Sequence, residues 1–401
     1  MNKITSYDLP EDVKFCQKCV ISNQRPSSVV EFKHQKVDKK PTIFFDKDGI
    51  CSACNYHKDK MSTVDWGERE DDLKSLLDKF RRTDGGYDVI VPGSGGKDSA
   101  FTSHVLKYKY GMNPLTVTWA PHLYTNIGWE NFQNWMLEGG LDNLLFTPNG
   151  KLHRILTKLA FHNLLHPFQP FIIGQRIIGP LVASRFGVKL VMYGENQAEY
   201  GNTVEENRNA LMDMEFFSTS NPLKMRFGGK TVQEIIDTYG FNKNDFTPYI
   251  PPSIEELIER QVEVHYLGYY LKWDPQECYY YAAENTSFKA NTERTQGSYS
   301  KYSSIDDKID PFHYYTTLIK FGIGRATYDA SQEVRNDKIT REEGVHLVNK
   351  YDCEFPTNYF KEFLEYIDTS EEEFWETIDK FRSTHLWKKT DAGWRLRHTV
   401  S

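Results

Sequence analysis

Hydrophobic residues in the first half of the chain alternate between short continuous runs and runs with helical spacing. The short runs, which are typical of buried strands, are residues 87–93, 114–120, 142–147 and 189–194. The segments that predict helices are 98–109, 129–138, 151–165 and 174–186. Strands that alternate with helices indicate right-handed crossovers and a mostly parallel sheet that is covered on both faces. The fold class predicted for this segment is therefore α/β.

Two regions of different character flank the α/β segment. Residues 1–62 are Lys-rich and bear four cysteines, and a predicted helix over 63–82 follows them. The region after residue 215 is predicted to be mostly helical, over 274–284, 311–321, 340–350, 356–367 and 370–382. We interpret the basic tail at 385–398 as a solvated helix end rather than a nucleic-acid patch. These boundaries predict three domains, over 1–62, 63–215 and 216–401.

Composition narrows the class of protein. The 401 residues carry a net charge of -7, which argues against an affinity based on neutralising a nucleic-acid backbone. No apolar run approaches the roughly 18 residues of a membrane helix, and the first residues lack the apolar segment of a secretory signal. Six cysteines are too few for a disulfide scaffold, so we expect reduced thiols and a cytoplasmic protein.

The strongest chemical signal, Gly-Ser-Gly-Gly-Lys-Asp-Ser at 93–99, follows the first predicted strand. Its glycines let the backbone approach a ligand, and the helix start that follows presents N–H groups to an anion. The spacing is not that of P-loop nucleotidases. It resembles the SGGxDS motif of the ATP-pyrophosphatase (PP-loop) family, whose loop grips the pyrophosphate of ATP while an acceptor oxygen attacks the α-phosphorus. The alternative is a Gly-rich turn without a ligand.

The residues that we assign to ATP and pyrophosphate include Thr118, which ends the second strand where adenine could lie. The full set is Gly93, Ser94, Gly95, Gly96, Lys97, Asp98, Ser99 and Thr118.

The second signal is a double Cys-x-x-Cys pattern. The pairs Cys16–Cys19 and Cys51–Cys54 lie 31 residues apart and suit a closed, tetrahedral Zn²⁺ site of the structural kind. The predicted region 1–62 is then a zinc ribbon whose metal supplies folding energy. A redox dithiol or two reduced pairs are the alternatives, and we expect His34 and His57 to be surface residues.

Two further segments hold candidate site residues. Glu195 and Asn196 follow the fourth strand, where ligands bind in open α/β sheets, although a solvated loop carboxylate is an equal alternative. Asp98 and Glu195 are the predicted ligands of the Mg²⁺ that accompanies ATP. A polar stretch over 289–308 predicts a long loop with a function, with an exposed charged loop as the alternative.

Taken together, the chain resembles the bacterial N-acetyl sugar amidotransferases of surface-polysaccharide and flagellin-sugar (pseudaminic- or legionaminic-type) biosynthesis. The resemblance covers about residues 14–366. The stretches that show it are FCQKCV, DKDGICSAC, YDVIVPGSGGKDS, YGENQAEYG, TERTQGSYSKYSSIDDKIDPFHYY, KFGIGRATYDASQEVRNDKITREE and YDCEFP. One departure is Thr292-Glu293-Arg294-Thr295, where Glu-Gly-Thr is expected.

This resemblance implies an ATP-dependent enzyme that converts the acetamido group of a sugar or nucleotide sugar to an acetamidino group. It implies an adenylated intermediate, release of AMP and pyrophosphate, and Mg²⁺ and Zn²⁺ as metals. Ammonia would come from a partner similar to the histidine-biosynthesis glutaminase, through a cyclase-like barrel subunit. Cys278 and Cys353 lack a nucleophile-elbow setting, which fits an external source of ammonia.

The remaining roles are assigned in two sets. The catalytic residues are expected to be Lys97, Asp98, Glu195, Lys289 and Arg325. The substrate-binding residues are expected to be Glu195, Asn196, Glu293, Tyr299, Lys301 and Arg335.

Two other functions remain open from the sequence. A tRNA-thiolating PP-loop enzyme would need a basic surface and normally a cysteine in the α/β domain, yet residues 87–200 contain none. A non-enzymatic zinc-ribbon scaffold would not need the polar loops described above.

Overall fold

The computed structural model of the chain describes residues 7–35, 39–194 and 209–401. Its main helices are α1 (Ser52–Thr63), α2 (Trp66–Phe80), α3 (Lys97–His104), α4 (Asn126–Leu137), α5 (Gly150–Leu164), α6 (Gln169–Phe186), α8 (Val232–Tyr239), α9 (Ile254–Glu259), α10 (Leu267–Tyr270), α11 (Pro275–Thr286), α12 (Asp310–Phe321), α13 (Arg325–Arg335), α14 (Arg341–Tyr351), α15 (Phe360–Tyr366) and α16 (Glu371–Lys380). A π-helical turn, η2 (Val105–Lys109), extends α3.

A five-stranded, fully parallel sheet forms the centre of the α/β part. Its strands are β1 (Val89–Pro92), β2 (Pro114–Trp119), β3 (Asp142–Phe146), β4 (Leu190–Tyr193) and β7 (Glu263–Tyr266). They lie in the order β3-β2-β1-β4-β7. After β1 the chain adds β2 and β3 on one side of β1, and it then returns so that β4 pairs with the other side of β1. This reversal creates a crevice at the carboxyl end of β1.

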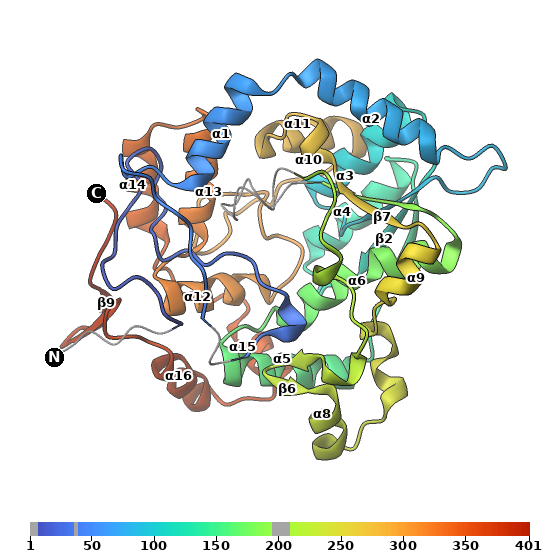
Figure 1. The fold of residues 1–401 in the computed structure, drawn as a ribbon. Helices are drawn as coiled ribbons and strands as arrows, with labels where there is room; N and C mark the ends of the chain where they lie inside the picture. Colours follow the sequence, from blue (N-terminus) through green and yellow to red (C-terminus); the bar gives the residue numbers. More distant parts are fainter. Residues whose placement is uncertain (1–6, 36–38, 195–208) are drawn as a thin grey trace.

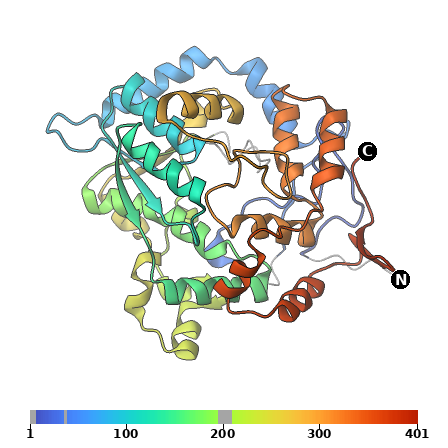
Figure 2. The ribbon, with the colours of Figure 1, turned by 180° about the vertical axis from the view of Figure 1, so that it is seen from behind.

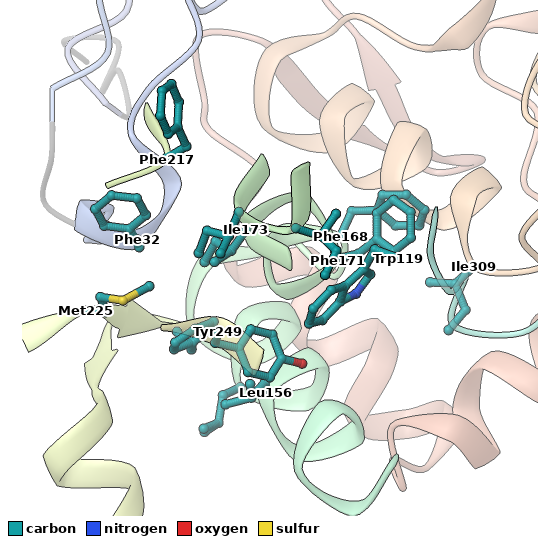
Figure 3. Packing of buried hydrophobic residues seen from close by; sticks show 14 of the residues in the cluster. Phe32, Trp119, Leu156, Phe168, Phe171, Ile173, Phe217, Met225, Tyr249 and Ile309 are labelled. Atoms are coloured by element: carbon teal, nitrogen blue, oxygen red, sulfur yellow. The ribbon is translucent and has the colours of Figure 1, made fainter. Parts of the chain in front are cut away.

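Alternate residues of the central strands face two separate cores. Ile90 of β1 and Val191 of β4 belong to the core that α5 and α6 cover. Their neighbours Val89 and Val91 belong to the core formed with α2, η2 and α10. Both faces are apolar because parallel sheets are buried on both sides. Figure 3 shows part of the larger core around Trp119, which ends β2.

The N-terminal and C-terminal parts of the chain lie side by side. Figure 1 shows the N-terminal segment beside α13 and α14, while α1 and α2 run across the top of the molecule to the side of the sheet. The reverse view in Figure 2 shows the same neighbours. Cys16, Cys51, Phe321, Ile323 and Val334 share one apolar cluster, so the N-terminal segment packs on the C-terminal helices.

The predicted fold class is confirmed: a parallel α/β core, a cysteine cluster near the N-terminus and a mostly helical C-terminal region. Two features differ from the prediction. The basic tail is not a helix end but an antiparallel hairpin of β8 (Trp387–Thr390) and β9 (Gly393–Leu396). The guanidinium of Arg382, which precedes the hairpin, lies 4.4 Å from the Trp387 ring centroid. The strand β7 comes from beyond residue 215, after the short strands β5 (Arg226–Phe227) and β6 (Lys230–Thr231).

We predict that Gly174→Ala destabilises the protein by about 1–3 kcal/mol, the usual cost of overpacking a core. Gly174 lies in α6, and a Cβ atom there would overlap the buried ring of Trp119. The free energy of unfolding in urea measures the effect. Gly150→Ala is the matched control, because Gly150 begins α5 with open space around it, and this change should raise stability by about 0.4–1 kcal/mol. Equal stability of the two variants would contradict the packing described here.

Candidate active site

The Gly-rich loop that follows β1 has the geometry of a phosphate cradle. Gly95 has a φ of +83°, and a Cβ atom at this position would lie 2.7 Å from the Cα of Phe132, so only glycine fits. The loop ends at Gly96, the N-cap of α3, where no side chain caps the helix. The N–H groups of the first helical turn lack intrahelical acceptors, and the positive end of the helix dipole adds to them. The loop is therefore suited to bind an anion.

The side chains that follow the loop are held at its mouth. Lys97 Nζ lies 2.6 Å from Asp98 Oδ2, and these side chains are 12% and 33% exposed. The hydroxyl of Ser99 donates to the carbonyl oxygen of Gly96 over 3.0 Å. The loop thus presents a cation, a carboxylate and two serine hydroxyls beside its N–H groups.

Two cavities meet at this loop and share Ser94, Gly96 and Asp98 as lining residues. The first, which we call the sheet-end cavity, has a volume of about 360 Å³. Gly93, at the end of β1, and Gly194, at the end of β4, line it, so it occupies the crevice predicted by the strand order. Arg25 and Arg176 also line it and give it cationic groups suited to phosphates.

The second cavity, which we call the C-terminal cavity, has a volume of about 440 Å³. One wall is the phosphate loop, and most of the opposite wall comes from residues 300–338. A buried clamp fixes this wall to the α/β part. The Asp307 carboxylate accepts the backbone N–H of His122 over 2.7 Å, and its Oδ2 lies 2.8 Å from His122 Nδ1.

The backbone of the preceding residues completes the clamp. Thr125 donates its N–H to Asp306 O over 3.1 Å and its hydroxyl to Ile305 O. Gly128 lets α4 approach this segment, because a Cβ atom there would lie within 2.7 Å of the Asp306 carbonyl oxygen. These contacts fix the position of Ile305 and Asp306, which line the C-terminal cavity.

Carboxylates outnumber cations along the C-terminal cavity. Asp306 hydrogen-bonds to Ser94 of the phosphate loop, and burial raises the pKa of its carboxyl group. Burial raises the pKa of Asp310, at the start of α12, to about 7. Arg325 begins α13 and lies 3.1 Å from Asp329. Asp98, Asp274 and Glu333 are the other acidic lining residues, and Lys97 and Lys338 are the other basic ones.

The structure brings together part of the predicted site. Gly93, Ser94, Gly95, Gly96, Lys97, Asp98 and Ser99 line one or both cavities, as does Arg325. Glu195 and Asn196 lie outside the described residues. Tyr299 reaches the C-terminal cavity through Glu333, whose carboxylate accepts its hydroxyl over 2.7 Å.

Other predicted residues lie elsewhere. Lys289 pairs with Glu130 at 2.5 Å on the surface, with its side chain 57% exposed. Glu293 and Lys301 are also exposed. Thr118 is buried in the sheet and accepts a hydrogen bond from Asn143 over 3.0 Å.

Sequence reasoning assigned no role to Asp306 and Asp310. Asp306 stands in the Ser- and Tyr-rich stretch 289–308 that the sequence marks as a functional loop, and Asp310 lies just after it. Asp310 stands before Pro311 at the start of a predicted helix. A carboxylate at this position normally stabilises the helix through the helix dipole, so it did not indicate a site.

The four N-terminal cysteines form a buried cluster whose sulfur atoms all lie within 4.8 Å of one another. Cys16 and Cys54 sulfurs are 3.9 Å apart, and those of Cys19 and Cys51 are 3.8 Å apart. Sulfurs bound at about 2.3 Å to one tetrahedral ion lie about 3.8 Å from each other, so the cluster fits Zn²⁺. None of these cysteines is in a disulfide.

The surroundings of the cluster suit thiolates. Backbone N–H groups of Lys18 and Cys51 donate to the Cys16 sulfur over 3.4 and 3.3 Å. Arg335, predicted to bind substrate, lies in α13 with its guanidinium 3.9 Å from the Cys19 sulfur. His34 and His57 are not surface residues as predicted but are 3% and 8% exposed, because the C-terminal helices cover this region.

The strand order and the Gly-rich loop define an α/β fold whose phosphate loop has the sequence pattern of the ATP-pyrophosphatase type. Residues 296–400 match the family described as "LPS biosynthesis protein WbpG-like, C-terminal domain". This match confirms, for that part of the chain, the predicted relation to bacterial surface-polysaccharide biosynthesis. No curated protein sequence matches the chain.

Among solved structures, the chain is similar to the NH3-dependent NAD synthetase from Campylobacter jejuni subsp. jejuni NCTC 11168 in complex with the nitrate ion. The identity is 14%, over 49% of this chain and 94% of that chain, with a TM-score of 0.28. The fold assignment rests on the strand order and the loop of this chain, because a similarity at this level adds no argument. Within the described residues, no helix is both long and apolar enough to cross a bilayer.

We predict one Zn²⁺ per chain, bound by Cys16, Cys19, Cys51 and Cys54, as measured by elemental analysis of the purified protein. Cys51→Ser should lose the metal and lower the melting temperature by at least about 3 °C, since 1 kcal/mol shifts melting by about 2–4 °C in domains of 150–250 residues. The exposed Cys353 provides the control, because Cys353→Ser should keep both metal and stability. The site would be refuted if the purified parent protein contained no metal and Cys51→Ser had the same melting temperature as the parent.

Proposed function

We propose that the protein is an ATP-dependent ligase that converts the acetamido group of a sugar to an acetamidino group during bacterial surface-glycan synthesis. The observation that supports this most directly is the position of the WbpG-like region. Residues 300–338 of that region form most of the wall that faces the phosphate loop. A domain typical of lipopolysaccharide biosynthesis would thus hold an acceptor beside a nucleotide.

The two cavities suggest where each substrate binds. The phosphates of ATP would bind at the loop N–H groups, Ser94, Lys97 and Ser99, with Arg176 beside them in the sheet-end cavity. Asp98 lines both cavities and is suited to share a Mg²⁺ with the phosphates; Glu195 stays a predicted second ligand. The acceptor sugar would occupy the C-terminal cavity, whose volume suits a ligand of this size.

The chemistry explains why ATP is needed. An amide carbonyl carbon is a poor electrophile, and its oxygen is a poor leaving group. Attack of the amide oxygen on the α-phosphorus would release pyrophosphate and make AMP the leaving group. Ammonia would then add to the activated carbon. The protein would contribute positioning and stabilisation of the charge on the departing pyrophosphate.

The ammonia source in this proposal is a partner. We propose a glutaminase subunit and a cyclase-like barrel subunit, because the sequence holds no nucleophile-elbow cysteine. A tRNA-thiolating activity is less well supported, since the chain is acidic overall and its C-terminal region matches a lipopolysaccharide family.

We predict that the protein forms AMP and pyrophosphate from ATP only when an acetamido sugar and ammonia are present. A panel of free and nucleotide-linked N-acetylhexosamines, with products separated by chromatography, tests this prediction. Lys97→Ala should slow the reaction by about 10²–10³-fold, because it removes a charged donor from the loop. ADP and phosphate as products would contradict the mechanism.

The matched control for this substitution is Lys380→Ala. Lys380 lies on the exposed face of α16, 3.8 Å from Glu376, so its removal should leave turnover unchanged. Zinc content and melting temperature of Lys97→Ala should equal those of the parent protein. Full activity of Lys97→Ala would overturn the role given to this side chain but not the reaction.

We predict that ammonium salts support turnover by the isolated chain and that glutamine does not. The rate at a fixed total ammonium concentration should rise from pH 7 to pH 9, because the unprotonated fraction grows about tenfold per pH unit below the pKa of ammonium. Adding a glutaminase partner should make glutamine effective near neutral pH. Turnover with glutamine and this chain alone would contradict the need for a partner.

A further inference from the structure

The proposed reaction requires a proton acceptor. An acetamido group has one N–H, and ammonia has three. The amidinium product retains three of these four hydrogens, so one proton must leave the reacting atoms. Lys97, Lys338 and Arg325 cannot accept it while protonated, and burial lowers the pKa of His313 well below its ordinary value, which makes its imidazole a weak base. The acceptor should therefore be a carboxylate of the C-terminal cavity.

Two of the cavity carboxylates are each paired with a cation at 3.1 Å or less, and a third, Asp274, lies 3.4 Å from Lys338 Nζ. Asp98 lies 2.6 Å from Lys97 Nζ. Asp329 lies 3.1 Å from Arg325 and also accepts the hydroxyl of Ser298 over 2.5 Å. A carboxylate in contact with a cation is a weak base, because the cation stabilises its charged form.

Two others serve the local structure. Asp274 is the N-cap of α11 and accepts the N–H of Gln276 over 2.9 Å. Glu333 accepts the hydroxyl of Tyr299 over 2.7 Å. Each therefore has an acceptor oxygen engaged by a donor of the protein itself.

The last two carboxylates differ in their distance from the phosphates. Asp306 hydrogen-bonds to Ser94, a residue of the phosphate loop, so a bound pyrophosphate would lie next to it. Asp310 stands in the first turn of α12 and hydrogen-bonds to the hydroxyl of Ser304, which does not belong to the phosphate loop. Asp310 and Glu333 are thus the cavity carboxylates that are neither paired with a described cation nor attached to the phosphate loop, and the Tyr299 hydroxyl already engages Glu333.

The charges around Asp310 come from three elements. Arg325 of α13 favours its charged form, whereas Asp306 and Asp307 of the preceding loop oppose it. Asp329, which pairs with Arg325, lines the same cavity, and His313 follows one turn later in α12. Burial dominates and raises the pKa to about 7, where a group can accept a proton in one step and release it in the next at neutral pH.

We propose that Asp310 is the general base of the reaction and accepts the proton from the acetamido nitrogen. This inference rests on the proposed function. As the amide oxygen bonds to the α-phosphorus and the bond to pyrophosphate breaks, the N–H electrons form the C=N bond and the proton moves to Asp310. When ammonia adds to the carbon, the C=N electrons return to nitrogen, which takes that proton back.

The second half of the reaction closes the balance. The C–O bond breaks with its electrons on AMP, and the added nitrogen loses one proton to the carboxylate of Asp310. The amidinium cation that forms lies beside a carboxylate, which then passes its proton to solvent. The acidic lining of the cavity suits this product, because its amidinium group is a cation whereas the acetamido group of the substrate is neutral.

The test is the acetamido-dependent exchange of labelled pyrophosphate into ATP, with N-acetylglucosamine and UDP-N-acetylglucosamine among the acceptors. This half-reaction needs no ammonia, so its pH dependence does not include the titration of ammonium. The wild-type rate should fall about tenfold per pH unit below pH 7, as Asp310 becomes protonated. Asp310→Asn should lower the rate at pH 8 by about 10²–10⁴-fold and abolish this dependence.

Two further variants separate catalysis from folding. Asp310→Glu should restore part of the rate together with the pH dependence. Asp391→Asn, in the exposed turn between β8 and β9, should match the wild type in rate and profile. Zinc content and melting temperature show whether Asp310→Asn is folded.

The outcomes distinguish the two proposals. If the wild type exchanges pyrophosphate and Asp310→Asn retains both its rate and its decline below pH 7, Asp310 is not the base and the proposed function stands. If Asp310→Asn is slower but keeps the decline, Asp310 has only a structural role. If no acetamido sugar supports exchange by the wild type, the proposed function fails and the role of Asp310 fails with it.

Discussion

The arrangement of the C-terminal cavity depends on one buried carboxylate. Asp307 accepts N–H groups from His122 and, within its own loop, from Ile309 over 2.9 Å, and its side chain is 3% exposed. A carboxylate so far from water is tolerated only when donors surround it. His122 belongs to the loop that follows β2, so its contact with Asp307 connects the sheet to the region that forms the opposite wall. Asp306 directly precedes Asp307, and Asp310 donates its backbone N–H to Asp307 O over 3.3 Å, so both carboxylates are positioned by this residue.

The sequence predicted the α/β part well because its signals are local. Buried strands, amphipathic helices and the Gly-rich loop each depend on residues that are close in the chain. The same holds for the paired cysteines, whose sulfurs cluster as the spacing indicated. The C-terminal hairpin was read as a helix end because Lys and Arg at its surface hid the role of Trp387, which packs in the large core.

The composition of the site was harder to predict. The sequence predicted Lys289 as a catalytic residue and Arg335 as a substrate-binding residue, because both are cations in or after the polar stretch 289–308. The fold places the first against Glu130 at the surface and the second against the Cys19 sulfur. The position of Asp310 before Pro311 did not indicate a site, because a carboxylate in the first turn of a helix is common, and the helix α13 that brings Arg325 near it was not predicted. Contacts between segments that are distant in the sequence determine the partner of each polar residue, and the sequence does not show these contacts.

The position of β7 has a consequence for synthesis of the chain. This strand completes the sheet, yet it emerges from the ribosome some 70 residues after β4, its neighbour. Until then β4 is an edge strand, whose unpaired backbone groups can pair with another chain. At typical synthesis rates of about 5–20 residues per second, the nascent protein would therefore expose the unpaired edge of β4 for several seconds. A chaperone that binds during translation would cover this edge. The order of the strands makes this useful, because β4 stays unpaired until β7 has been synthesised.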